Sequence, residues 1–131
     1  MPHAQIEVRR SWTVDEEIAI IDAVHEALVA AFRIPVGDKH IRFIEHQPHR
    51  FAAPPSLSQP DYLTMVHIDC FAGRSVEAKR RLYREIVERL EVLGIPRDQV
   101  SIAVRDLPVE NWGIRGGQAA CDVDLGFNVG V

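Results

Sequence analysis

The chain has 131 residues, a net charge of −4 and an apolar fraction of 47%, values typical of one ordinary globular domain. The acidic balance argues against a nucleic-acid partner, and no apolar run approaches the roughly 18 residues that a membrane helix needs. The N-terminus has no basic segment followed by an apolar one, so no signal peptide is expected and a cytoplasmic location is predicted.

Cysteines and histidines form no pattern typical of a metal site. Cys70 lies in an apolar, strand-like run, which favours a buried free thiol over a disulfide with Cys121. Among the six histidines, His40, His46 and His49 lie close together in the sequence, but without an HExxH motif or a nearby cysteine, so surface histidines are favoured there over a zinc site. For His67, inside the same strand-like run, packing is favoured over a supporting catalytic role. No metal and no cofactor are therefore expected.

The first half of the chain reads as strand, helix, strand. Residues Gln5–Arg9 alternate between apolar and polar, which predicts a strand. Thr13 and Glu16 have the spacing of a capping box, and apolar residues then recur at helical spacing until Pro35 stops the helix. The mostly apolar Ile41–Ile44 predicts the second strand.

The second half repeats this order after a proline-rich loop over 49–60. Tyr62–Phe71 is rich in strand-forming residues, and Ser75 can cap a helix that Pro96 stops. Residues 100–104 alternate cleanly and predict the last strand. The glycine-rich tail that follows is expected to be a loop and then a short hairpin or edge strand.

The two halves form a tandem βαβ repeat, because Thr13–Pro35 and Ser75–Pro96 have nearly the same length and pattern. Repeat units of about 2–48 and 61–107, with a C-terminal segment over 108–131, make one α/β (α+β) domain. We expect a four-stranded mixed sheet with two helices on one face. The other face would need a partner, which predicts a homo-oligomer.

A duplicated βαβ unit with Pro2 directly after the initiator Met1 resembles the tautomerase superfamily. Three further runs look like its malonate semialdehyde decarboxylase branch, namely Ile34–Lys39, Ala72–Lys79 and Asn111–Gly113. The resemblance covers nearly the whole chain. It implies a tautomerase/MIF-like fold and a homotrimer with active sites at the subunit interfaces.

The resemblance also implies roles for four residues. Pro2 matches the family's catalytic N-terminal proline, and Arg74 matches the arginine that binds the substrate carboxylate. Asp38 matches the aspartate credited with positioning or activating water, and Trp112 matches the aromatic residue that walls the pocket. The decarboxylase has a second arginine where this chain has Ala72. The sequence therefore favours a tautomerase, with a decarboxylase or hydratase as the alternative.

The chemistry of these residues suits a small anionic keto or enol acid as substrate, such as a phenylpyruvate-like or hydroxymuconate-like compound. Apolar surroundings or a nearby cation lower the pKa of an N-terminal amine such as that of Pro2. The neutral amine can take a proton and return it to another carbon, whereas the protonated amine suits hydration or decarboxylation. Arg74, at a helix start, can bind a carboxylate through two parallel hydrogen bonds.

Simpler interpretations remain open for several residues. A solvated Arg74 is disfavoured, because a cation at a helix N-terminus opposes the helix dipole. Asp38 could equally shape the turn after Pro35. Arg9 and Arg10 could reach a neighbouring subunit's site, although a solvated turn is favoured. A non-enzymatic trimeric binding protein is a further alternative, which retention of the initiator methionine would support.

Overall fold

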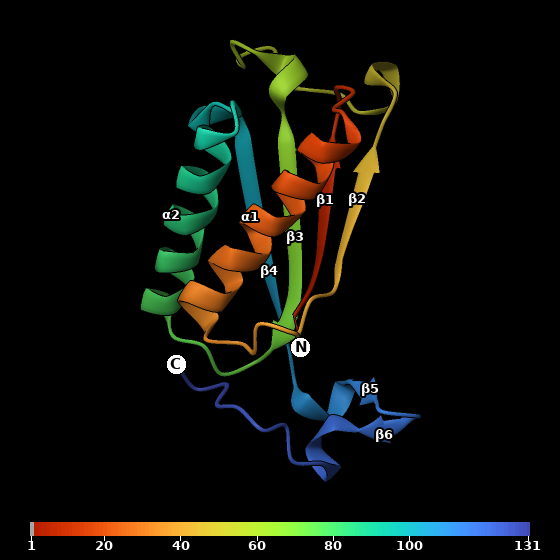
Figure 1. The fold of residues 1–131 in the computed structure, drawn as a ribbon, viewed down its shortest axis with the longest axis vertical. Coiled ribbons are helices and arrows are strands. Elements are labelled where there is room, and N and C mark those ends of the chain that lie inside the picture. The colour runs from red at the N-terminus through yellow and green to blue at the C-terminus, as the bar shows by residue number, and fades with distance from the viewer. Residues whose placement is uncertain (1) are drawn as a thin grey trace.

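The computed structural model describes residues 2–131 and contains a tandem βαβ repeat (Figure 1). The main elements, in chain order, are β1 (His3–Val8), α1 (Val14–Phe32), β2 (Ile41–Glu45), β3 (Thr64–Phe71), α2 (Val76–Val92) and β4 (Val100–Leu107). Two short strands follow, β5 (Gly113–Ile114) and β6 (Gln118–Ala119). The proline-rich connection between the halves contains two short 3-10 turns, Pro48–Arg50 and Pro60–Tyr62.

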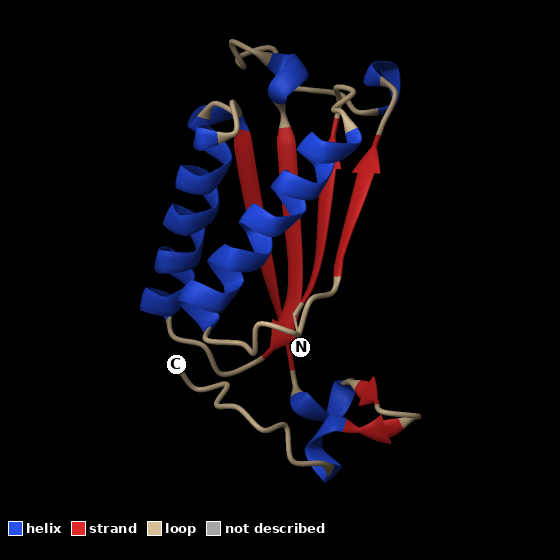
Figure 2. Ribbon diagram, in the orientation of Figure 1, coloured by secondary structure: helices blue, strands red, loops and turns tan. Residues whose placement is uncertain are grey.

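The main sheet has four strands in the order β2-β1-β3-β4. The β1–β2 and β3–β4 pairs are parallel, and the central β1–β3 pair is antiparallel, so the sheet is mixed. Both helices cover the same face of this sheet (Figure 2). The predicted topology is therefore confirmed. Neither helix within residues 2–131 is long and apolar enough to cross a membrane.

Local sequence signals explain where the helices begin and end. The Thr13 hydroxyl accepts from the Glu16 N–H, and the Glu16 carboxylate accepts from the Thr13 N–H, which confirms the capping box. The Ser75 hydroxyl accepts from the Ala78 N–H at the start of α2. Helix α1 ends at Phe32, before Pro35, because Arg33 adopts a left-handed conformation with a φ of 53°.

The core lies between the sheet and the two helices. Alternate residues of β1 and β3 face the helices and are buried, while both helices contribute one apolar stripe each. The largest fully buried apolar side chains of this layer are Ile6, Ile20, Leu28, Phe32, Ile68, Leu82, Ile86, Leu90 and Ile95. Cys70 belongs to the same layer and is a free, fully buried thiol, as predicted.

The sheet face opposite the helices is uncovered and mostly polar. Gln5, Glu7, His67 and Asp69 are half-buried there, in the strand positions that alternate with the core. Arg105 on β4 binds Asp69 through two hydrogen bonds, of 2.6 and 3.0 Å. The predicted uncovered face is confirmed, but a partner on it would meet hydrogen-bonding groups and ion pairs in addition to apolar surface.

The C-terminal segment differs from the prediction in its order. The β5–β6 hairpin comes first. Its tight turn is possible because Gly116 and Gly117 adopt positive φ values of 83° and 94°. An irregular tail follows and returns to the start of α2 (Figure 1), where the Ser75 N–H donates to the Val131 carbonyl at 2.9 Å. The predicted sequence of loop and then hairpin was therefore wrong, and the tail instead helps to build the α2 start.

Candidate active site

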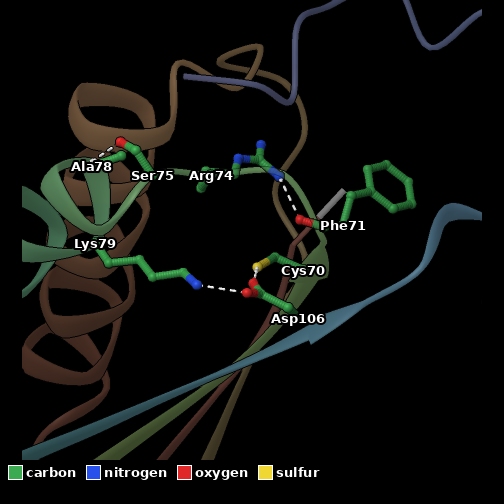
Figure 3. Close-up of polar contacts among 7 residues, drawn as sticks. All are labelled: Cys70, Phe71, Arg74, Ser75, Ala78, Lys79 and Asp106. Atoms are coloured by element: carbon green, nitrogen blue, oxygen red, sulfur yellow. Dashed lines mark hydrogen bonds and ion pairs between the residues drawn. The ribbon is translucent and has the colours of Figure 1, made fainter.

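Arg74 joins the end of β3 to the start of α2 and is the most unusual side chain in the fold. It is only 5% exposed, and its guanidinium lies over the Phe32 ring at 4.8 Å from the ring centre. Its Nη1 donates to the Phe71 carbonyl at 3.3 Å (Figure 3), while Nε and Nη2 find no acceptor within residues 2–131. Unpaired buried donors on a cation are costly, so this arrangement is suited to an incoming anion.

Burial and nearby acidic groups shift the pKa of Arg74 in opposite directions. Burial lowers the pKa of Arg74, while the nearby Cys70, Asp106 and Asp38 raise it. A guanidinium keeps its proton under such conditions, so Arg74 remains a cation at neutral pH. The fold thus holds a positive charge in a poorly solvated position, where it attracts a carboxylate more strongly than it would in water.

Pro2 lies at the same end of the fold as Arg74. It is buried, and it occupies the strand alternation of Ala4, which faces the helices. His3 pairs with Asp69 in the antiparallel register, so one further step places Pro2 opposite Cys70 on the core side. Cys70 lies near the end of β3, four residues before Arg74, so the start of β1 and the start of α2 meet at this end of the sheet.

Trp112 forms an aromatic wall beside these residues. It is 7% exposed, and its ring packs edge-on against Phe71 and His3, with centroid separations of 5.0 Å in both cases. Its buried Nε1–H has no acceptor among residues 2–131, which gives the site another unpaired donor. Burial, followed by the charges of His40 and Arg42, lowers the pKa of His3, so His3 is neutral at pH 7.

Asp38 lies after α1 and lines a small cavity next to the C-terminal segment. Its Oδ1 is 3.1 Å from His40 Nδ1, and its charge raises the pKa of Arg74, so it belongs to the same neighbourhood. The cavity has a volume of about 160 Å³ and is lined by Pro35, Asp38, Ile114, Arg115, Leu125 and Phe127. Pro2, Asp38, Arg74 and Trp112 thus lie at the same end of the sheet.

The comparisons with known proteins show the family of the chain. Residues 38–115, more than half of the chain, match the family model described as a tautomerase enzyme. The chain belongs to the tautomerase family. It is 24% identical over 123 residues to the probable tautomerase YusQ of Bacillus subtilis, covering 91% of this chain and 97% of that protein.

Solved structures of this family have the same fold. A structure of FG41 malonate semialdehyde decarboxylase inhibited by 3-bromopropiolate is 29% identical, with a TM-score of 0.81 over 89% of this chain and 92% of that chain. The F6 fused 4-OT, described as an asymmetric trimer, has a TM-score of 0.82 at 21% identity, over 92% and 97% of the two chains. The second likeness shows the fold alone.

Several residues near the candidate site were not selected from the sequence. Asp106 on β4 accepts from Lys79 Nζ at 2.5 Å and from the Cys70 thiol at 3.5 Å (Figure 3). Asp106 continues the strand alternation of residues 100–104, so the sequence places a carboxylate at a helix-facing position. This unusual placement could have identified Asp106 as a candidate. Arg115 lines the same cavity as Asp38 and lies three residues after Trp112 in the chain. No sequence pattern distinguished it from the other arginines.

Arg9 and Arg10 lie at the opposite end of the sheet from Arg74, half-buried in the bend after β1. Arg9 donates to the carbonyls of Pro60 and Pro48, at 2.9 and 3.4 Å. Arg10 lies over the rings of Trp12 and Tyr62, at 4.4 and 4.5 Å from their centres. These contacts connect the start of α1 to the loop between the halves, so this predicted turn is only partly solvated.

Other surface features do not join the candidate site. Among residues 2–131, no three His, Cys, Asp or Glu side chains are placed to hold one metal ion. Two open grooves of about 390 and 410 Å³ share Glu26 and Arg89 on the outer surface of the helices. Arg74 and Asp38 line neither groove, so both grooves are separate from the candidate site.

Proposed function

We propose that this protein is a cofactor-independent tautomerase for a small 2-keto or enol carboxylic acid, with Pro2 as the general acid and base. One observation carries the proposal: the Arg74 guanidinium is buried, its Nε and Nη2 have no acceptor within residues 2–131, and it lies at the end of the fold where Pro2 precedes β1. A cation in this state matches a substrate carboxylate, and a buried amine beside it favours its neutral form.

The reaction needs only one proton carrier. With the carboxylate on Arg74, the neutral Pro2 amine takes the proton from the enol hydroxyl of the substrate. The carbonyl forms as the double bond shifts, and the same nitrogen returns the proton to the neighbouring carbon, which restores the amine. Trp112, packed against the fully buried Phe71, offers apolar surface to the rest of the substrate and excludes water.

The proposal includes self-association as a homotrimer in the cytoplasm. The uncovered sheet face has polar groups available to a second copy, and a similar structure, the F6 fused 4-OT, is described as a trimer. Light scattering coupled to size exclusion tests this part, and a monomer at all concentrations would contradict it.

A decarboxylase or hydratase is the second candidate, and Asp38 is the observation that favours it. Asp38 borders a small cavity and is engaged by His40, an arrangement that could orient a water molecule. A malonate semialdehyde decarboxylase is among the similar structures. The single arginine weighs against this candidate, because Ala72 leaves the anion site with one guanidinium.

The decisive experiment compares Pro2→Ala with the unmodified protein on phenylenolpyruvate, followed by ultraviolet absorbance. Intact mass must first show that Met1 has been removed, since an acylated proline nitrogen has no basicity. We expect kcat/KM to fall by about 10²–10⁴-fold, the usual contribution of a positioned proton-transfer group. Pro55→Ala, in an exposed loop, is the matched control.

Three results would argue against the tautomerase. One is equal turnover by Pro2→Ala, and another is retention of Met1 by the active protein. The third is faster conversion of malonate semialdehyde than of phenylenolpyruvate, which would favour the decarboxylase.

A further inference from the structure

The Asp106 carboxylate lies close enough to Arg74 to act on it, yet it does not bind it. Asp106 pairs with Cys70 in the parallel register of β3 and β4, on the side of the sheet that faces the helices. Its negative charge raises the pKa of Arg74. However, Nε and Nη2 of Arg74 have no acceptor within residues 2–131, so the two groups are neighbours without a hydrogen bond.

Both oxygens of Asp106 are engaged by other groups. Oδ2 accepts from Lys79 Nζ at 2.5 Å, and Oδ1 accepts from the Cys70 thiol at 3.5 Å. Figure 3 shows Asp106 between these partners, with Arg74 on the far side of Cys70. Burial raises the pKa of Cys70 to about 11, so the thiol keeps its proton and adds no negative charge beneath the site.

A buried arginine and a nearby carboxylate would ordinarily form an ion pair, and that pair would occupy the anion site. We propose that Lys79 is a positioning residue that holds the Asp106 carboxylate away from Arg74, so that Arg74 stays open to a substrate carboxylate. This inference rests on the proposed function and deepens it, because it names what keeps the substrate-binding cation available.

Lys79 is suited to this task by its place on α2. It lies one helical turn after Ser75, and its side chain is 23% exposed, so its ammonium is partly withdrawn from solvent. The Lys79–Asp106 pair is neutral as a unit. Without the ammonium, an uncompensated carboxylate would remain beside Arg74 and would compete with any bound carboxylate for its charge.

Binding of phenylacetate, a carboxylate with no reactive carbonyl, measures the anion site independently of turnover. By isothermal titration calorimetry we expect Lys79→Met to raise the Kd by about 3–10-fold, as suits a partly exposed charge near the ligand. Lys79→Arg keeps the charge and should stay within about twofold of the unmodified protein. Arg80→Met is the matched control, since Arg80 pairs with the exposed Glu77 on the same helix.

The double variant Lys79→Met/Asp106→Asn separates positioning from a structural role. Removing the competing charge together with its partner should recover most of the lost affinity, whereas lost packing would add up in the double variant. In turnover assays, Lys79→Met should raise KM and leave kcat nearly unchanged, because it affects substrate binding and not proton transfer.

The outcomes separate this inference from the proposed function. A folded Lys79→Met that binds phenylacetate like the Arg80→Met control overturns the inference, as does a double variant weaker than the single one. Failure of the unmodified protein to bind phenylacetate overturns it as well. If the Lys79 pattern holds while Pro2→Ala leaves turnover unchanged, the inference stands and the tautomerase assignment fails.

Discussion

The two βαβ units share one topology but treat their helix starts differently. At the start of α1, the capping box gives acceptors to the backbone N–H groups of Thr13 and Glu16, and three acidic residues occupy the first turn. At the start of α2, Ser75 caps one N–H, Glu77 is the one acidic residue of the first turn, and the buried Arg74 comes directly before the cap. The carboxylates in the first turn of α1 already interact with the positive end of the helix dipole, so this helix start does not favour binding of a further anion.

The arginines of the two units differ in the same way. Arg9 and Arg10 are engaged by carbonyls and aromatic rings, and only Nε of Arg9 lacks an acceptor within residues 2–131, whereas both Nε and Nη2 of the more deeply buried Arg74 lack one. The C-terminal tail adds to the contrast, because Val131 accepts from Ser75 and Val129 lies against Gly73. The two units therefore differ in how far their arginines are engaged by other groups, and the proposed site lies at the end where Arg74 is less engaged.

The largest expected effect contrasts Arg74→Ala with Arg10→Ala. Loss of the guanidinium that binds the substrate should lower kcat/KM on phenylenolpyruvate by about 10²–10³-fold. Arg10→Ala removes a cation–π contact distant from the site and should change kcat/KM by less than about threefold, with a stability loss of about 1 kcal/mol. Equal kinetic effects of both substitutions would remove the distinction between the two ends.

The next effect comes from Gly73→Ala, at the turn before Arg74. Gly73 has a φ of 132°, and an added Cβ would lie 3.2 Å from the Val129 carbonyl oxygen. We expect a loss of about 1–3 kcal/mol in the free energy of unfolding, measured by urea titration. Gly37→Ala is the control, since no atom lies within 4 Å of its added Cβ, and its effect should be about 0.5 kcal/mol or less. Similar losses at both glycines would contradict this account of the turn.

A smaller effect distinguishes the two helix caps. Thr13→Ala breaks the capping box, whereas Ser75→Ala removes a single hydrogen bond to the Ala78 N–H. Both should lower the melting temperature, each by the equivalent of about 1 kcal/mol, with the larger loss at Thr13. A larger loss at Ser75 would show that α2 depends more on its cap than α1 does.

The smallest effect is the pH dependence of the first cap. The hydrogen bond from the Thr13 backbone is the main reason why the pKa of Glu16 is lowered from its ordinary value of 4.5. A lowered folded-state pKa stabilises the protein above the unfolded value, and this gain is lost as the pH falls through the folded value. The stability difference between the unmodified protein and Glu16→Gln should therefore be constant from about pH 6 to 8 and shrink below about pH 4.5. A difference that stays unchanged down to about pH 3 would contradict this role.

Local signals made much of the fold predictable. The capping residues, the apolar helical stripes and the alternating strands are properties of short segments, and the repeat fixed their order. The burial of Cys70 followed from its apolar strand. Arg74 could be selected because a cation directly before a helix is unusual, and the resemblance to tautomerases supplied its role.

Contacts between distant segments could not be predicted in this way. The Lys79–Asp106 pair depends on how α2 packs against β4, and the stacking of Arg10 depends on where Tyr62 returns after the long loop. The order of the hairpin and the irregular tail was also predicted wrongly. The tail is held by the hydrogen bond between Val131 and Ser75, which joins the end of the chain to its middle. Such interactions are set by tertiary packing, which no single segment of the sequence specifies.

Covalent labelling with 2-oxo-3-pentynoate tests the central pairing of Pro2 and Arg74 most directly. Its carboxylate should bind Arg74, and a neutral amine adds across its activated triple bond, so the adduct retains the whole reagent mass. In a Cys121→Ser background, which removes the exposed thiol, we predict one adduct on Pro2 of the Met1-free protein, lost in Arg74→Ala. Labelling elsewhere, no labelling, or equal labelling of Arg74→Ala would contradict the account.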